Sequence, residues 1–125
     1  MIKSTYAYVQ TLYIKKERGT IMERFCKFGK LKATKGNGAK LLDILLAASK
    51  ELEEVDNCFC YIVGQNENEL DAVYVYEVWE NKDAHQKSLQ LLAVKKLIES
   101  AMPILDMSKL ESYPDLTIYG GKASL

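Results

Sequence analysis

The segment formed by residues 72–85 constrains the fold most, because a strand that is apolar on both faces runs directly into a helix. Alternate residues of a strand share a face, so the two faces are formed by Ala72, Tyr74, Tyr76 and Val78 and by Val73, Val75, Glu77 and Trp79. Asn81 is then a good N-cap for the helix. This corner holds the only tryptophan and the only histidine of the chain, Trp79 and His85. The sequence therefore places its candidate site here.

Composition and charge indicate one globular domain. A chain of 125 residues can bury one core but not two, and a hydrophobic fraction of 48% is ordinary for such a domain. The 17 basic and 17 acidic residues cancel, so no net charge draws the protein to nucleic acid or to anionic lipid. No apolar run approaches the roughly 20 residues of a membrane helix, and the amino terminus has no signal-type apolar block. We expect a cytoplasmic protein that binds neither nucleic acid nor membrane.

The three cysteines are an odd number and do not form the disulfide framework of a small secreted domain. Cys58 and Cys60 are predicted to lie on one face of a strand, with Phe59 on the other. Such a pair can bind a metal, but it needs further ligands, and the chain has one histidine. We therefore favour the interpretation that Cys26, Cys58 and Cys60 are small buried apolar residues.

Hydrophobic periodicity predicts the order of the first elements. Alternation indicates a strand over residues 24–34, with Lys30 and Lys32 on one face. Asn37 is the predicted N-cap of a helix over about residues 39–55, whose leucines recur at three- and four-residue spacing. Two strands follow, over residues 58–63 and residues 71–80. The polar turn between them, at residues 64–69, is short enough for an antiparallel hairpin.

The carboxyl-terminal half completes a ferredoxin-like pattern. A second helix from Ala84 to Ala101 can bend at residues 89–92, and a last strand is expected near residues 116–120. The resulting order is the split βαββαβ arrangement of an α+β domain with an antiparallel sheet. Two helices cover only one face of this sheet, yet residues 72–79 are apolar on both faces. We therefore expect a homodimer in which the open sheet faces of two protomers pack together.

Residues 1–21 do not fit this order. A charged stretch at residues 15–19 precedes Met22, and its Lys-Glu-Arg-Gly segment can be encoded by a purine-rich run that resembles a bacterial ribosome-binding sequence. One hypothesis is that the natural start is Met22 and that residues 22–125 form the domain. The other is that residues 1–21 are a genuine N-terminal extension that adds an edge strand or covers the partner.

The corner resembles that of the antibiotic biosynthesis monooxygenase family, in which a Glu-x-Trp strand end precedes a helix with an Ala-His pair near its start. The matching residues here are Glu77, Trp79, Ala84 and His85. One branch of the family continues as Ala-His-Gln-x-Ser-Leu and ends in Ala-x-Pro-Ile, as residues 84–89 and 101–104 do. The resemblance covers about residues 22–125 and implies a small dimeric α/β barrel. Members include cofactor-free oxygenases of quinols and anthrones, haem-degrading oxygenases and proteins without an assigned reaction, so the fold does not fix the activity.

We predict a cofactor-independent monooxygenase that oxidises a quinol, an anthrone or a similar hydroxylated aromatic with dioxygen. The deprotonated substrate reduces dioxygen itself, so the protein supplies a base, a dry pocket and orientation. His85 is the expected base, and Trp79 is expected to stack on the substrate ring and exclude water. Glu77, if buried, needs a partner, for which His85, a lysine or the other subunit are candidates. The predicted substrate-binding residues are Tyr61, Tyr74, Tyr76, Tyr119, Leu89 and Leu92.

Alternatives stay open at this point. His85 can be structural, Trp79 a core residue, Glu77 a member of an ion pair and the tyrosines packing residues. A haem-binding monooxygenase would use His85 as the axial iron ligand. Haem-degrading relatives, however, carry an asparagine on the first strand and a tryptophan on the second helix; residues 24–34 contain no asparagine, and Trp79 precedes the helix. The third function is a non-catalytic dimeric module that binds a small ligand.

Overall fold

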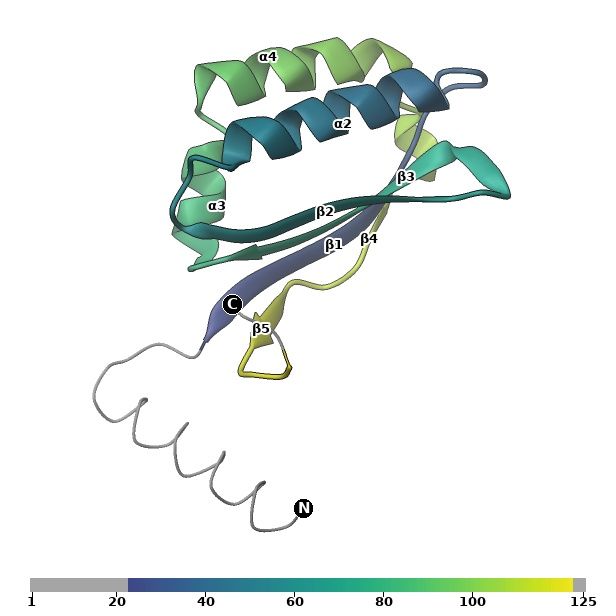
Figure 1. The fold of residues 1–125 in the computed structure, drawn as a ribbon. Coiled ribbons are helices and arrows are strands. Elements are labelled where there is room, and N and C mark those ends of the chain that lie inside the picture. Colours follow the sequence, from purple (N-terminus) through teal and green to yellow (C-terminus); the bar gives the residue numbers. More distant parts are fainter. Residues whose placement is uncertain (1–22, 123–125) are drawn as a thin grey trace, which may run out of the picture.

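An antiparallel sheet lies under α-helices in the computed structural model, which describes residues 23–122 (Figure 1). The sheet order is β2-β3-β1-β4, and β5 also pairs with β1. The strands are β1 (Arg24–Lys32), β2 (Cys58–Asn66), β3 (Glu69–Trp79), β4 (Glu111–Ser112) and β5 (Leu116–Ile118). The helices are α2 (Gly38–Leu52), α3 (Lys82–Ser88) and α4 (Leu92–Ala101), with the short 3₁₀ helices η1 (Met102–Ile104) and η2 (Met107–Lys109).

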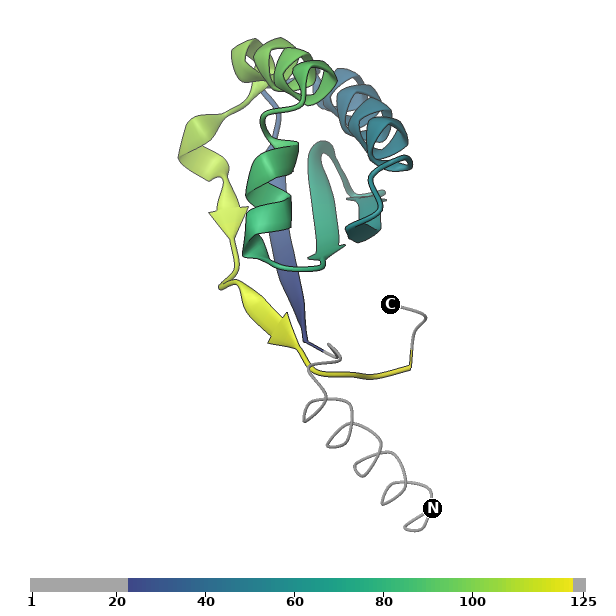
Figure 2. The same cartoon turned by 90° about the vertical axis from the view of Figure 1, so that its left-hand side faces the viewer.

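The helices form one layer over one face of the sheet, so the predicted ferredoxin-like α+β fold is confirmed. Helices α2 and α4 lie side by side, and α3 connects the end of β3 to α4 (Figures 1 and 2). Three details differ from the prediction. The strands of the hairpin are longer than predicted, and only residues 67 and 68 separate β2 from β3. The second predicted helix is divided into α3 and α4 at residues 89–91. The strand β4 was not predicted. The predicted extension of residues 1–21 and the proposed start at Met22 lie outside the described residues.

The first turn of α2 is held by a side chain from β3. Asn37 occupies the N-cap position as predicted, but its side chain does not cap the helix and instead donates to Thr34 Oγ1 at 2.8 Å. The Asp71 carboxylate accepts from the backbone N–H groups of Gly36 and Gly38, at 3.1 and 2.9 Å. These two hydrogen bonds hold the pKa of Asp71 below its usual value. The predicted capping role of Asn37 is therefore wrong, because a residue distant in sequence takes it.

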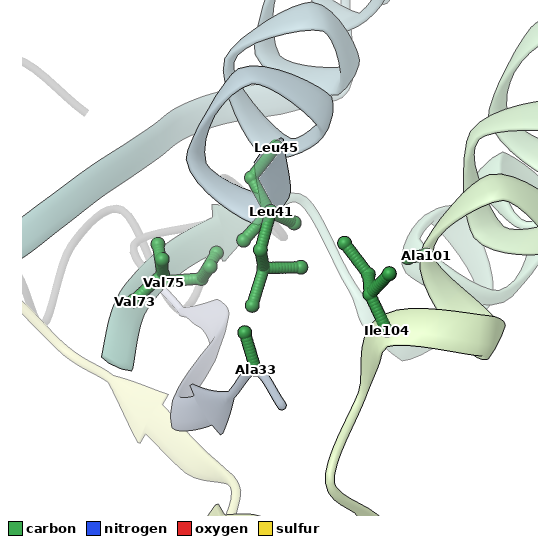
Figure 3. Packing of buried hydrophobic residues seen from close by; sticks show 7 residues of the cluster. All are labelled: Ala33, Leu41, Leu45, Val73, Val75, Ala101 and Ile104. Atoms are coloured by element: carbon green, nitrogen blue, oxygen red, sulfur yellow. The ribbon is translucent and has the colours of Figure 1, made fainter. Parts of the chain in front are cut away.

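Two clusters of buried side chains fill the space between sheet and helices. One cluster joins α2, β3 and the end of α4 and consists of Ala33, Leu41, Leu45, Val73, Val75, Ala101 and Ile104 (Figure 3). The other surrounds the end of β3 and consists of Leu52, Trp79, Ala84 and Val94. Val73, Val75 and Trp79 share one face of β3, as the alternation predicted, and the structure shows that this face is turned to the helices. Glu77 lies on the same face, and between Val73 and Trp79 it is the only charged residue of β3.

The opposite face of the sheet carries an aromatic cluster. Phe28 stacks on Tyr113 with ring centroids 4.9 Å apart, and it lies 5.8 Å from Tyr76 and 6.4 Å from Tyr74. Ile62, which pairs with Tyr76, is 58% exposed. In residues 23–122 no helix covers this face (Figure 1). Both faces of β3 are therefore apolar. One face packs in the core under the helices, and the other carries this aromatic cluster.

The predicted common face of Cys58 and Cys60 is wrong. Cys58 pairs with Trp79, whereas Cys60 pairs with Val78, because the register of β2 shifts between them as at a β-bulge. Cys58 therefore faces the helices and Cys60 the open face, and burial raises the pKa of Cys58 to about 11. Within residues 23–122 the cysteines are free thiols, and no group of three His, Cys, Asp or Glu side chains is placed to hold a metal.

We expect Gly38→Ala to destabilise the fold. A Cβ at this position would overlap the backbone of Leu70 and Asp71, where the start of α2 meets β3. Overpacking of this kind costs about 1–3 kcal/mol, which urea denaturation would detect. Gly64→Ala is the matched control, since a Cβ there meets nothing within 4 Å, and we expect no loss of stability. Equal stabilities of the two variants would contradict the close contact at Gly38.

Candidate functional site

The corner between β3 and α3 places the imidazole of His85 against the end of β3. Asn81, in an extended conformation, ends the strand, and its side-chain oxygen accepts from Ala84 N at 2.8 Å. The predicted N-cap is thus confirmed. The helix α3 is only 7 residues long, and His85 lies on its helical turn nearest the strand. The local sequence therefore directs His85 toward the side chains at the end of β3.

Three of the predicted site residues are in contact. The indole Nε1–H of Trp79 donates to Glu77 Oε1 at 3.0 Å, and His85 Nε2 lies 3.7 Å from the same oxygen. The rings of Trp79 and His85 meet edge to face, with centroids 5.5 Å apart, and Phe25 lies 5.9 Å from His85. The side chains of His85 and Glu77 are only 12% and 16% exposed. A carboxyl group and an imidazole therefore form a largely buried pair.

Burial sets the protonation of this pair. Desolvation raises the pKa of Glu77 above its usual value, although the Trp79 hydrogen bond and the Lys27 ammonium oppose the shift. Desolvation lowers the pKa of His85, and the charge of Lys27 lowers it further, while Asp115 acts in the opposite direction. His85 is therefore unprotonated at neutral pH. A buried imidazole in this state can accept a proton.

A cavity of about 300 Å³ adjoins the pair on the helix-facing side of the sheet. Its apolar walls come from Leu31, Leu45, Val75 and Leu110. Its polar groups include Lys27, Tyr61 and Glu77. A largely apolar recess with a few polar side chains is typical of a small-molecule site, and this volume is at the lower end of the usual range.

The cavity does not include every predicted residue. Trp79 is 0% exposed, and neither its indole nor the His85 imidazole is among the lining side chains. Tyr61 lines the cavity, but Tyr74 and Tyr76 lie on the opposite face of the sheet. The other predicted binding residues are exposed on the outside of the fold: Leu89 (39%), Leu92 (68%) and Tyr119 (59%). Of the predicted site residues, the structure therefore places four around Glu77 and the cavity: Tyr61, Glu77, Trp79 and His85. The other five predicted residues lie elsewhere on the fold.

Lys27 was missing from the sequence prediction. It lies on β1 directly opposite Glu77, and its Nζ is 2.9 Å from Asp115 Oδ1. The signal was present in the alternation of residues 24–32, where Lys27 shares the helix-facing side with Phe25 and Leu31. A lysine at a position where its neighbours are apolar marks a cation that needs an acidic partner.

Comparison with known proteins identifies the family of this chain. The family model for antibiotic biosynthesis monooxygenase matches residues 24–100. The chain belongs to this family. The resemblance at residues 77–89 is thereby confirmed. No curated protein matches this chain at a significant level.

Solved structures of similar proteins support the same fold. A protein from Chloroflexus aurantiacus, proposed to be an antibiotic biosynthesis monooxygenase, is 24% identical; the match covers 81% of this chain and 97% of that one, with a TM-score of 0.66. One from Deinococcus radiodurans is 22% identical over 81% and 96% of the two chains, with a TM-score of 0.61. One from Bacteroides thetaiotaomicron is 12% identical over 82% and 95%, with a TM-score of 0.71. Identities this low establish the fold and leave the reaction to the site.

The site does not fit axial haem ligation by His85. The Nε2 atom lies against the Glu77 carboxyl, and the ring contacts Phe25 and Trp79. The imidazole is not among the side chains that line the adjoining cavity.

Over residues 23–122, no helix is long and apolar enough to cross a membrane.

We expect His85 to titrate below its usual pKa of 6.5. It is the only histidine of the chain, so a tag-free protein gives one imidazole signal in NMR. Lys27→Met should raise this pKa, because it removes a cation and frees the Asp115 carboxylate. The control Lys87→Met, which breaks an exposed pair with Asp83, should leave it unchanged.

The lowered pKa of His85 also makes the free energy of unfolding depend on pH. The unfolded chain binds a proton at His85 near pH 6.5, whereas the folded protein does so only at lower pH. The unfolded state therefore holds more protons in this window, and His85 makes the fold less stable as the pH falls through it. A wild-type pKa at or above 6.5 would contradict the buried neutral imidazole.

Proposed function

We propose that this protein is a cofactor-independent monooxygenase that oxidises a quinol, an anthrone or a similar hydroxylated aromatic with dioxygen. The observation that carries the proposal is the buried pair of Glu77 and His85 beside an apolar-walled cavity. A planar aromatic fits such walls, and its acidic hydroxyl requires a base. Membership of the family supports oxidation chemistry.

The proton leaves the substrate through Glu77. This carboxyl lines the cavity, so it meets the substrate hydroxyl before His85 does. Its raised pKa makes it a better proton acceptor than an exposed carboxylate. His85 Nε2, at 3.7 Å, then takes the proton after an approach of roughly half an ångström or more, since catalytic hydrogen bonds are often long before the substrate binds.

The electrons come from the substrate anion. It transfers one electron to dioxygen, and the resulting aromatic radical combines with superoxide to form a C–O bond. The imidazolium of His85 returns its proton to the peroxide through Glu77, which lines the cavity. For an anthrone, loss of water then converts the CH₂ group into C=O, so that one oxygen atom enters the product and the other leaves as water. The protein supplies a base, an apolar-walled site and orientation.

Trp79 serves this site as a positioning residue in the proposal. Its indole is buried and donates to Glu77 Oε1, so it fixes the carboxyl beside His85. This role differs from the predicted stacking on the substrate, which needs an indole face open to the cavity. Tyr61, at the cavity wall, remains the proposed hydrogen-bonding residue for the substrate.

We also propose that the protein is a homodimer through its open sheet face. The support is the cluster of Phe28, Tyr74, Tyr76 and Tyr113, which no helix of the described residues covers. An apolar patch of this kind closes on its own copy across a two-fold axis.

Oxygen consumption with a panel of quinols and anthrones tests the reaction. We expect His85→Ala and Glu77→Gln each to lower kcat by at least about 100-fold, because removal of a general base has effects of this size. Lys87→Met, on the exposed side of α3, should keep the wild-type rate. Wild-type protein that binds these aromatics without consuming oxygen would overturn the proposal in favour of a non-catalytic binding module.

A second experiment tests the dimer. Ile62 is 58% exposed on the open face, so Ile62→Lys should place a charge in the interface and yield monomers in sedimentation equilibrium. Leu92→Lys is the control, since Leu92 is 68% exposed on α4, away from that face. A wild-type monomer, or two variants with the same mass, would contradict the interface.

A further inference from the structure

We infer that Lys27 and Tyr61 form an anion-binding position, which holds the deprotonated oxygen of the aromatic substrate while Glu77 receives its proton. This inference rests on the proposed function and assigns roles to two residues beside the Glu77 and His85 pair. Lys27 has no other assigned role.

The sheet register brings the three side chains into one row. Lys27 on β1 pairs with Glu77 on β3, and Glu77 pairs with Tyr61 on β2. Paired residues of neighbouring strands point to the same face, and strands lie about 4.8 Å apart, so the row spans roughly 10 Å. Lys27, Glu77 and Tyr61 all line the cavity. A hydroxyl above Glu77 is therefore flanked by a cation and by a phenol.

The Lys27 ammonium is held in place by Asp115, and two of its N–H donors have no acceptor among the described residues. Its Nζ bonds to Asp115 Oδ1 at 2.9 Å and lies 5.7 Å from the centre of the Phe25 ring. An ammonium has three N–H donors, and among the described residues Asp115 accepts from one. The Lys27 side chain is 32% exposed and lines the cavity, which is where a ligand would meet the other two donors.

Tyr61 supplies the second donor. Burial and the neighbouring Glu77 raise its pKa well above the usual value, so its hydroxyl stays protonated and can donate. In the described part of the chain it contacts the buried cluster around Trp79, and it also lines the cavity. A phenolate oxygen accepts from such donors more strongly than a neutral phenol does.

The charges around the cavity favour an anion at this position. The Lys27 charge already lowers the pKa of both Glu77 and His85, so it would act in the same direction on a bound hydroxyl. Glu111 also lines the cavity, but its carboxylate lies 3.4 Å from Lys30 Nζ. While Glu77 holds the substrate proton, before His85 takes it, the carboxyl is neutral and does not repel the substrate anion.

Ionisation of bound 4-nitrophenol tests this position without turnover, because its phenolate absorbs visible light. At the pH where free 4-nitrophenol is half ionised, we expect the bound ratio of phenolate to phenol to be about tenfold higher in the wild type, which is one pKa unit. Lys27→Met should abolish the increase, Lys27→Arg should keep it, and Tyr61→Phe should reduce it. Lys32→Met is the control, because this lysine of β1 lies on the open face.

Nitrobenzene, which cannot ionise, separates loss of charge from loss of the cavity. We expect Lys27→Met to bind it as the wild type does. If both probes bind but Lys27→Met leaves the nitrophenol ratio unchanged, the inference is wrong while the proposed reaction stands on its own oxygen assay. If the wild type binds neither probe, the inference and the assignment of this cavity as the substrate site both fail.

Discussion

The buried carboxyl of Glu77 is the constraint around which the site is built. It lies on the helix-facing side of β3, between Val75 and the fully buried Trp79, where a charge without partners is strongly unfavourable. The indole N–H of Trp79 stabilises it, and His85 and Lys27 lie on either side as the groups that can share or balance its charge. The burial of the Glu77 side chain therefore explains its raised pKa and its need for these neighbours.

The two faces of β3 have separate tasks. Val73, Val75 and Trp79 pack under the helices, and Val75 and Glu77 line the cavity, while Tyr74 and Tyr76 join the aromatic cluster on the open face. Because both sets of residues belong to one strand, a partner seated on the open face would hold the floor of the cavity from behind. Rigid support of this kind favours a site whose groups must keep their geometry.

Much of the fold and part of the site followed from periodicity alone. Alternation predicted which residues of β3 share a face, and the single tryptophan and histidine indicated the corner at Asn81. The same alternation already separated Tyr74 and Tyr76 from Glu77, so assigning them to the same pocket conflicted with the predicted strand. Asp71, as the cap of α2, could not be predicted, since the contact depends on how β3 passes the helix. The shift at Phe59 was also hidden, because a bulge is defined by strand pairing.

The contribution of Lys27 depends on register, which a single sequence does not specify. One strand shows only that a lysine lies among apolar neighbours, and the pairing with Glu77 and Tyr61 appears when β1, β3 and β2 are aligned. A slip of one residue would turn Lys27 to the open face and leave Glu77 without a cation beside it. The apolar residues that share its face therefore fix the register of the strand and, with it, the electrostatics of the cavity. In this chain the core packing and the proposed chemistry are specified by the same alternation.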